Sequence, residues 1–119
     1  MTTAYPLRYV LCRLEDIEDP GSVALTLAAA GGPQDIFVVR RGAQAWGYVN
    51  SCPHTGGPLD WVPGQFLDLG REYIQCATHD ALFGIADGVC IAGPCAGDRL
   101  TVVPLVIEAG NIIFPGSPA

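Results

Sequence analysis

The 119-residue chain contains no lysine and only two histidines, so all six of its permanent cations are arginines. Twelve acidic residues outnumber them and give a formal net charge of −6 at pH 7. A surface with this balance repels phosphate groups, so binding to nucleic acid or to an anionic membrane is not expected. Charged residues make up only 15% of the chain and hydrophobic residues 50%, which excludes disorder as the default state.

Long apolar segments are also missing. No run approaches the roughly 20 apolar residues that a membrane-spanning helix requires, and residues 1–8 lack the apolar stretch of a signal peptide. We therefore expect a soluble, cytoplasmic protein with no membrane partner. The chain has no phosphate-binding glycine motif and no nucleophile paired with a base, so we expect no catalytic residues and no substrate reaction on this chain alone.

The composition favours one small β domain. Fifteen glycines and ten prolines are spread along the chain and separate short apolar runs, a pattern typical of strands rather than helices. Hairpin turns are predicted at 40–44 and 108–111. Residues 22–30 contain helix formers and can be interpreted as helix, strand or loop. Strands are predicted at 9–14, 36–41, 45–49, 73–76, 81–85, 99–107 and 112–114.

Both histidines lie beside a cysteine. The chain contains Cys52-Pro53-His54 and, after the 21 residues 55–75, Cys76-Ala77-Thr78-His79. Such spacing lets two loops each present one thiolate and one imidazole to a shared inorganic centre. Two glycines and two prolines around the first pair suit a tight loop that approaches a bulky cofactor.

This arrangement resembles the Rieske family, over a stretch from about Trp46 to Pro104. The resemblance includes Tyr48-Val49-Asn50-Ser51 before the first loop, Leu82-Phe83 after the second, and the turns at Asp87-Gly88 and Gly93-Pro94. It implies one 2Fe-2S cluster, with two cysteines on one iron and two histidines on the other. The implied ligands are Cys52, His54, Cys76 and His79.

Zinc is the alternative occupant, because it also accepts two thiolates and two imidazoles. Familiar zinc motifs keep the cysteines together and the histidines together, whereas here the two residue types alternate along the chain. The alternation and the flanking glycines and prolines favour the iron-sulfur cluster.

The resemblance also implies the fold: an all-β, Rieske-type antiparallel β sandwich with an inserted cluster-binding subdomain. We expect a single domain over residues 1–119, with a basal part at about 1–50 and 99–119 and a cluster-binding part at about 51–98. The 21-residue gap is somewhat longer than the family usually shows, which predicts an extended hairpin at 60–71.

The implied function is that of a Rieske-type ferredoxin, a low-potential one-electron carrier from a flavin-dependent or iron-sulfur reductase to a terminal (di)oxygenase. No histidine is left for a second, mononuclear iron, so the oxygenase chemistry would take place on a partner. We expect a monomer with transient partners. Two alternatives remain: a small Rieske-fold subunit of a larger oxidoreductase such as a nitrite reductase, and a redox-sensing binding module.

A low potential is predicted from residues that high-potential Rieske proteins have and this chain lacks. The extra cysteines of those proteins match Gly57 and Thr78, and their serine and tyrosine donors to the cluster sulfurs match Ala81 and Phe83. Lost donors disfavour the more negative, reduced cluster. Asp80, next to His79, acts in the same direction.

Acidic residues are concentrated around the implied cluster. Residues 51–98 hold six acids and one arginine, a net charge of −5, whereas the remaining residues have a net charge of −1. This distribution indicates either docking of a basic partner or ordinary solvation.

Three cysteines fall outside the motif. Cys12 lies in a strand-like run and is interpreted as a buried hydrophobe. Cys90 and Cys95 flank a predicted turn, so both free thiols and a disulfide remain open for them.

Overall fold

The computed structural model describes residues 9–29, 32–53, 57–60, 62, 64–76, 81–93 and 97–115. Their strands form three sheets with antiparallel pairing throughout, and the helical content of these residues is one 3-10 turn at Leu14–Asp16. The predicted all-β, antiparallel class is therefore confirmed. Within the same residues, no helix has the length and hydrophobicity to cross a bilayer.

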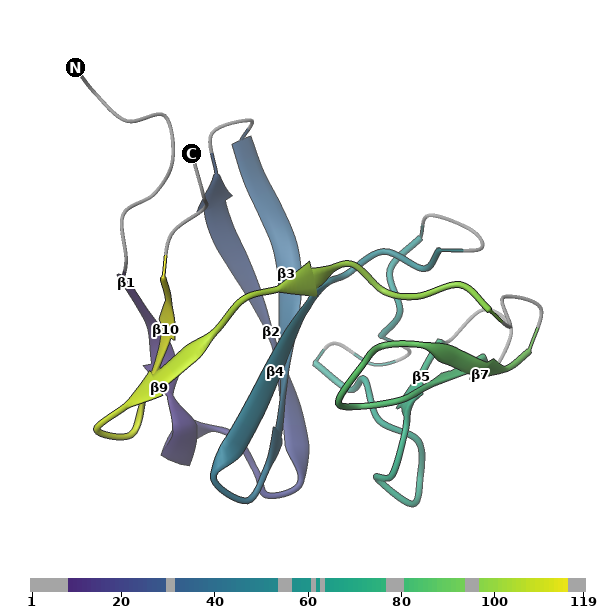
Figure 1. Ribbon diagram of the computed structural model, residues 1–119, viewed down its shortest axis with the longest axis horizontal. Coiled ribbons are helices and arrows are strands. Elements are labelled where there is room, and N and C mark those ends of the chain that lie inside the picture. The colour runs from purple at the N-terminus through teal and green to yellow at the C-terminus, as the bar shows by residue number, and fades with distance from the viewer. Residues whose placement is uncertain are drawn as a thin grey trace.

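Two sheets form the base of the molecule, at the left and centre of Figure 1. The first has the order β1-β10-β9, with β1 at Tyr9–Arg13, β10 at Asn111–Phe114 and β9 at Val106–Glu108. The second has the order β2-β3-β4-β8, with β2 at Gly21–Ala29, β3 at Gly32–Arg41, β4 at Gln44–Val49 and β8 at Val102–Val103.

Strand β3 lies at the centre of the base. Its residues from Ile36 to Val39 are all buried, which explains why this run is continuously apolar instead of alternating. Strand β2 covers residues 22–29 of the ambiguous segment 22–30, whose last residue lies outside the described ones, and pairs with β3 from Gly21↔Arg40 to Ala29↔Gly32. Pairing with β3 therefore makes this segment a strand, although its local propensity allowed a helix, a strand or a loop. The predicted hairpin turn at 40–44 contains Gly42 with a φ of 64°.

The third sheet is smaller and has the order β5-β6-β7. Its strands are β5 at Ile74–Gln75, β6 at Leu82–Phe83 and β7 at Cys90–Ala92. Strand β7 was not predicted, because its short apolar run between glycines carries no clear period. The single strand expected at 99–107 is wrong: it divides into β8 and β9, which belong to different sheets. Pro104 lies between them and has no N–H to continue a ladder.

The connection at 60–71 contains no named strand among its described residues. Two isolated antiparallel bridges between described residues involve it, Val62↔Gln65 and Leu67↔Ile74. The N–H groups of Asp68 and Gln75 donate to the carbonyls of Tyr73 and Phe66, so the extended hairpin predicted there is reduced to these pairings in the part of the chain that the structure describes. The connection is tied to β2 by Ser22, whose Oγ donates to the Gly64 carbonyl at 2.8 Å and accepts from the Phe66 N–H at 3.2 Å.

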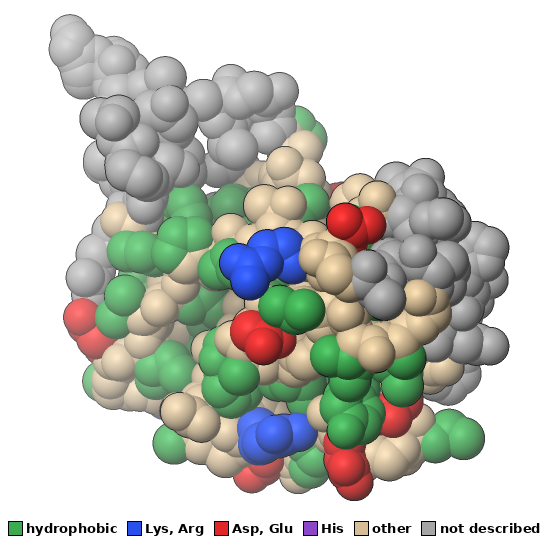
Figure 2. Space-filling view, turned by 45° about the vertical axis from the view of Figure 1, so that its right-hand side comes forward, with side chains coloured by type: hydrophobic (Ala, Val, Ile, Leu, Met, Phe, Trp, Pro, Cys, Tyr) green, Lys and Arg blue, Asp and Glu red, His purple; other side chains and the backbone are tan. Residues whose placement is uncertain are grey.

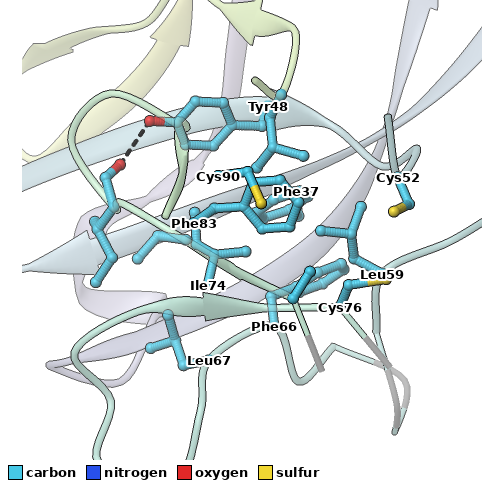
Figure 3. Packing of buried hydrophobic residues seen from close by; sticks show 14 residues of the cluster. Phe37, Tyr48, Cys52, Leu59, Phe66, Leu67, Ile74, Cys76, Phe83 and Cys90 are labelled. Carbon is cyan, nitrogen blue, oxygen red and sulfur yellow. Dashed lines mark hydrogen bonds between the residues drawn. The ribbon is translucent and has the colours of Figure 1, made fainter. Parts of the chain in front are cut away.

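A cluster of buried side chains joins the base to the third sheet (Figure 3). Phe37 of β3 stacks on Phe66, with ring centroids 4.2 Å apart and an interplanar angle of 5°. Tyr48 of β4 donates from its hydroxyl to the Ile85 carbonyl at 2.6 Å. These two contacts hold the inserted residues against the basal sheet.

The buried phenol of Tyr48 makes the fold sensitive to alkali. Burial, and secondly the carboxylate of Asp87, raise its pKa to about 12. An ordinary tyrosine in the unfolded chain has a pKa of about 10, so the stability contributed by Tyr48 is complete below pH 10 and is lost as the pH rises towards 12. Between pH 9 and pH 11, we expect the free energy of unfolding of the wild-type protein to fall by about 1 kcal/mol more than that of Tyr48→Phe. Denaturant titrations at the two pH values measure this difference, and equal slopes in both proteins would contradict it.

Candidate metal centre

Two of the four predicted ligands are described, and both are deeply buried. Cys52 lies just beyond β4 and Cys76 directly follows β5, with 1% and 0% of their surfaces exposed. Both belong to the buried cluster that joins the base to the third sheet, and Figure 3 shows their sulfur atoms at one edge of it, next to Leu59. The structure therefore brings together the two cysteines that the motif singled out. His54 and His79 lie outside the described residues.

The two cysteine loops are closed in the same way. The N–H of Cys52 donates to the carbonyl of Gly57 at 2.8 Å, and the N–H of Cys76 donates to the carbonyl of Ala81 at 2.9 Å. Each bond spans five residues along the chain. In the sequence, each loop encloses one histidine, at position 54 or 79. Two matched loops with a buried thiol at the start of each are what a shared centre with alternating cysteine and histidine ligands requires.

This donor set fits a metal-sulfur centre. Two buried thiols can give thiolates that soft metal ions bind, and burial at the edge of an apolar cluster excludes water from that side. The described neighbours are apolar as well, since Leu59, Ala81 and Phe83 are almost completely buried. Ala81 and Phe83 carry no hydroxyl, so their side chains donate no hydrogen bond to such a centre.

Cys12 and Cys90 are described as well, and neither belongs to the predicted ligand set. Cys90 is a thiol outside any disulfide, and its Sγ donates to the Ala92 carbonyl at 3.3 Å. The disulfide left open in the sequence is therefore absent at Cys90, and Cys95 lies outside the described residues. Cys12 is partly buried, and burial, together with the Asp16 carboxylate, raises the pKa of its thiol.

Several acids of the inserted part have local structural roles. Three of them accept hydrogen bonds from backbone N–H groups of their own loops. Asp60 accepts from Gly64 at 3.2 Å, and Asp87 accepts from Val89 at 3.0 Å. Asp68 accepts from Glu72 at 3.0 Å and from Tyr73 at 3.2 Å. On the face seen in Figure 2, acidic side chains are scattered among neutral and arginine side chains and form no continuous patch. Loop architecture thus explains part of the local acidity, and the docking interpretation stays a prediction.

Sequence reasoning missed the role of Asn50. Its Oδ1 accepts from the Leu59 N–H at 2.8 Å, and its Nδ2 donates to Asp60 at 3.3 Å. These bonds connect residues that precede and follow the first cysteine loop. The run Tyr48-Val49-Asn50-Ser51 contained a signal, because asparagine often bonds to nearby backbone in turns and loops.

The family model of the Rieske [2Fe-2S] domain matches residues 8–106. The chain belongs to this family, and its cofactor is accordingly a 2Fe-2S cluster. No curated protein matches the chain.

Solved structures with the same fold include two ferredoxins and one oxygenase. The ferredoxin of carbazole 1,9a-dioxygenase from Nocardioides aromaticivorans IC177 is 20% identical, with a TM-score of 0.69 over 91% of this chain and 96% of that one. A ferredoxin of Sphingomonas yanoikuyae B1 is 22% identical, with a TM-score of 0.69 over 90% and 96%. The terminal oxygenase of carbazole 1,9a-dioxygenase from Novosphingobium sp. KA1 is 16% identical, with a TM-score of 0.73 over 90% of this chain and 29% of that one.

Proposed function

We propose that the protein is a Rieske-type ferredoxin that carries one electron at a time, at low potential, from a reductase to a terminal oxygenase. The observation that carries the proposal is the pair of cysteine loops closed by equivalent hydrogen bonds in a Rieske domain. Similarity to the N. aromaticivorans ferredoxin over 96% of that chain supports the ferredoxin role.

The proposed ligands are Cys52 and Cys76 for one iron and His54 and His79 for the other. When bound, the cluster supplies a centre that accepts and gives up one electron. The protein's own contribution is to hold two thiolates at the edge of an apolar cluster and to exclude water there. We further propose that residues 51–98 form the cluster-binding part of a single domain, since the sheet β5-β6-β7 lies within this range.

Iron and acid-labile sulfide analysis of the purified protein tests the centre. We expect two irons and two sulfides per chain and a Rieske-type EPR signal after dithionite reduction. Zinc without sulfide would overturn the proposal. Turnover with a purified reductase and oxygenase then tests the carrier role, and a permanent complex on gel filtration would instead indicate a fixed subunit.

The proposed partners are a flavin-dependent or iron-sulfur reductase and a terminal oxygenase. One similar structure, with 19% identity and a TM-score of 0.71 over 90% of this chain, is a complex of reduced oxygenase and oxidized ferredoxin in carbazole 1,9a-dioxygenase. Because the chain has a net charge of −6 and no lysine, we expect a basic docking face on its partner. Electron-transfer rates should fall severalfold between low salt and roughly 0.5 M salt. A rate independent of salt would contradict electrostatic docking.

Hydroxyl groups added beside the centre should raise its potential. Ala81→Ser introduces a hydroxyl donor at a buried position of the second loop. Phe83→Tyr introduces one at a buried position of β6. A bond that favours the reduced cluster by about 1.4 kcal/mol raises a one-electron potential by about 59 mV. We expect a wild-type value near the lower end of the family range of roughly −150 to +300 mV, and shifts of tens of millivolts upward.

Protein-film voltammetry measures these potentials. Ala86→Ser is the matched control. Ala86 is exposed in the neighbouring turn, so the hydroxyl that this substitution introduces faces solvent. A wild-type midpoint well above zero, or unchanged values in both variants, would contradict the explanation.

A further inference from the structure

The second cysteine loop is the tip of a regular hairpin. Strands β5 and β6 pair Gln75 with Leu82 and Ile74 with Phe83, and the bond from Cys76 to Ala81 continues the same register. The backbone ladder thus fixes both ends of this loop relative to one another. Here the position of Cys76 is set by main-chain pairing.

The first cysteine loop has the same register without the strands. Cys52 pairs with Gly57 as Cys76 pairs with Ala81. Two residues further out, Asn50 and Leu59 occupy the places that Ile74 and Phe83 occupy in the hairpin. No named strand flanks this loop on its C-terminal side among the described residues. Instead, the Leu59 N–H donates to Oδ1 of Asn50 at 2.8 Å, where a paired strand would offer a backbone carbonyl.

Asp60 orients the Asn50 carboxamide. One carboxylate oxygen accepts from Asn50 Nδ2 at 3.3 Å, and the other accepts from the Gly64 N–H at 3.2 Å. This arrangement directs the carboxamide oxygen towards Leu59. The main chain of Asn50 is held as well, because its N–H donates to the Asp35 carbonyl of β3 at 2.9 Å. Asn50 therefore joins the basal sheet to the far end of the loop.

We propose that Asn50, oriented by Asp60, is a positioning residue for the 2Fe-2S cluster: its side chain replaces the missing strand pair and fixes the first cysteine loop. The inference rests on the ligand set proposed above. Without the Asn50 oxygen, the ends of the first loop can separate, and the cluster is released faster and held in a wider range of geometries. The second loop, closed by backbone pairing, has no such dependence on one side chain.

Reciprocal exchange of the two side chains tests the proposal. In N50D the new carboxylate still accepts from the Leu59 N–H but faces the carboxylate of Asp60. In D60N the new carboxamide has one acceptor oxygen, where Asp60 offers two, so it cannot accept from both Asn50 Nδ2 and the Gly64 N–H through separate oxygens. The double variant N50D/D60N restores all three bonds, reverses donor and acceptor only in the bond between the two side chains, and leaves the net charge unchanged. Asn50→Ala removes the acceptor altogether.

The readouts are the rate of cluster loss to an iron chelator, followed by visible absorbance, and the EPR line shape of the reduced protein. We expect about tenfold or faster loss in Asn50→Ala and in each single exchange, with broader EPR lines, and recovery to within about twofold of wild type in the double variant. Ser22→Ala is the control, because it removes the bonds from β2 to the Gly64 carbonyl and the Phe66 N–H and leaves the bonds among Asn50, Leu59 and Asp60 in place. It should lower the thermal midpoint and leave both readouts unchanged.

The outcomes separate this inference from the proposed function. A wild-type protein without a cluster overturns the proposed function itself, before any variant is compared. Wild-type rates of cluster loss in Asn50→Ala, or a double variant no better than its single parents, overturn the role of Asn50 and leave the electron-carrier function standing.

Discussion

Cys76→Ala should purify without iron, without labile sulfide and without a Rieske-type EPR signal. The substitution removes a proposed ligand whose thiol is completely buried at the start of the second loop. The remaining ligands cannot complete the coordination of that iron, and assembly of the cluster fails. Metal analysis and EPR of protein expressed with added iron measure the loss.

Cys90→Ala is the matched control. Cys90 belongs to the same buried cluster as Cys76, so both substitutions remove one sulfur atom from the same apolar environment. Its thiol donates to the nearby Ala92 carbonyl. We expect this variant to keep the wild-type content of iron and sulfide. Equal loss in both variants would indicate a packing effect and would contradict the assignment of Cys76 as a ligand.

Phe66→Ala should lower the free energy of unfolding by about 3–5 kcal/mol. Phe66 is fully buried and stacks on Phe37, so truncation leaves a cavity at the joint between the basal sheet and the inserted residues. For a chain of this size the loss corresponds to a fall of about 10–20 °C in the thermal midpoint. Calorimetry of the cluster-loaded protein measures the change.

Two further substitutions define this effect. Phe66→Leu keeps most of the volume and loses the ring contact, so its cost should be clearly smaller than that of Phe66→Ala. Leu69→Ala alters the same connection at a side chain that is 93% exposed, and its effect should stay within about 0.5 kcal/mol. A loss below 1 kcal/mol in Phe66→Ala would show that the stacked pair does not hold the two parts together.

Local sequence patterns were sufficient for the strands whose apolar residues lie in clear runs, such as β4, β10 and the part of β3 from Ile36 to Arg41; residues 32–35 of β3 were not predicted. These patterns were insufficient where pairing with another strand determines whether a segment forms a strand and to which sheet it belongs. Residues 22–29 become part of β2 because β3 lies beside them, and the run 99–107 is divided at Pro104 between two sheets. Neither outcome depends on local propensity, so neither could be derived from the segment alone.

At the candidate site, too, sequence patterns predicted some residues and missed others. Cys52 and Cys76 were predicted from their spacing to the histidines, and the structure places both in one buried cluster. The ligand roles of all four residues, Cys52, His54, Cys76 and His79, stay predictions. Asn50 escaped prediction because its side chain bonds to a backbone N–H nine residues away, and hydrophobic periodicity carries no information about such a bond.

The pairing of β4 with β8 also determines how the length of the segment between them affects the basal sheet. Gly47 and Tyr48 pair with Val103 and Val102, so the chain leaves the basal sheet and returns to it at adjacent positions. The number of residues between these points does not alter the register of any basal strand. Each doubling of such an excursion costs only about 0.6 kcal/mol of closure entropy. Residues inserted into the exposed part of the connection at 60–71, around Leu69, therefore leave the register of the basal strands unchanged.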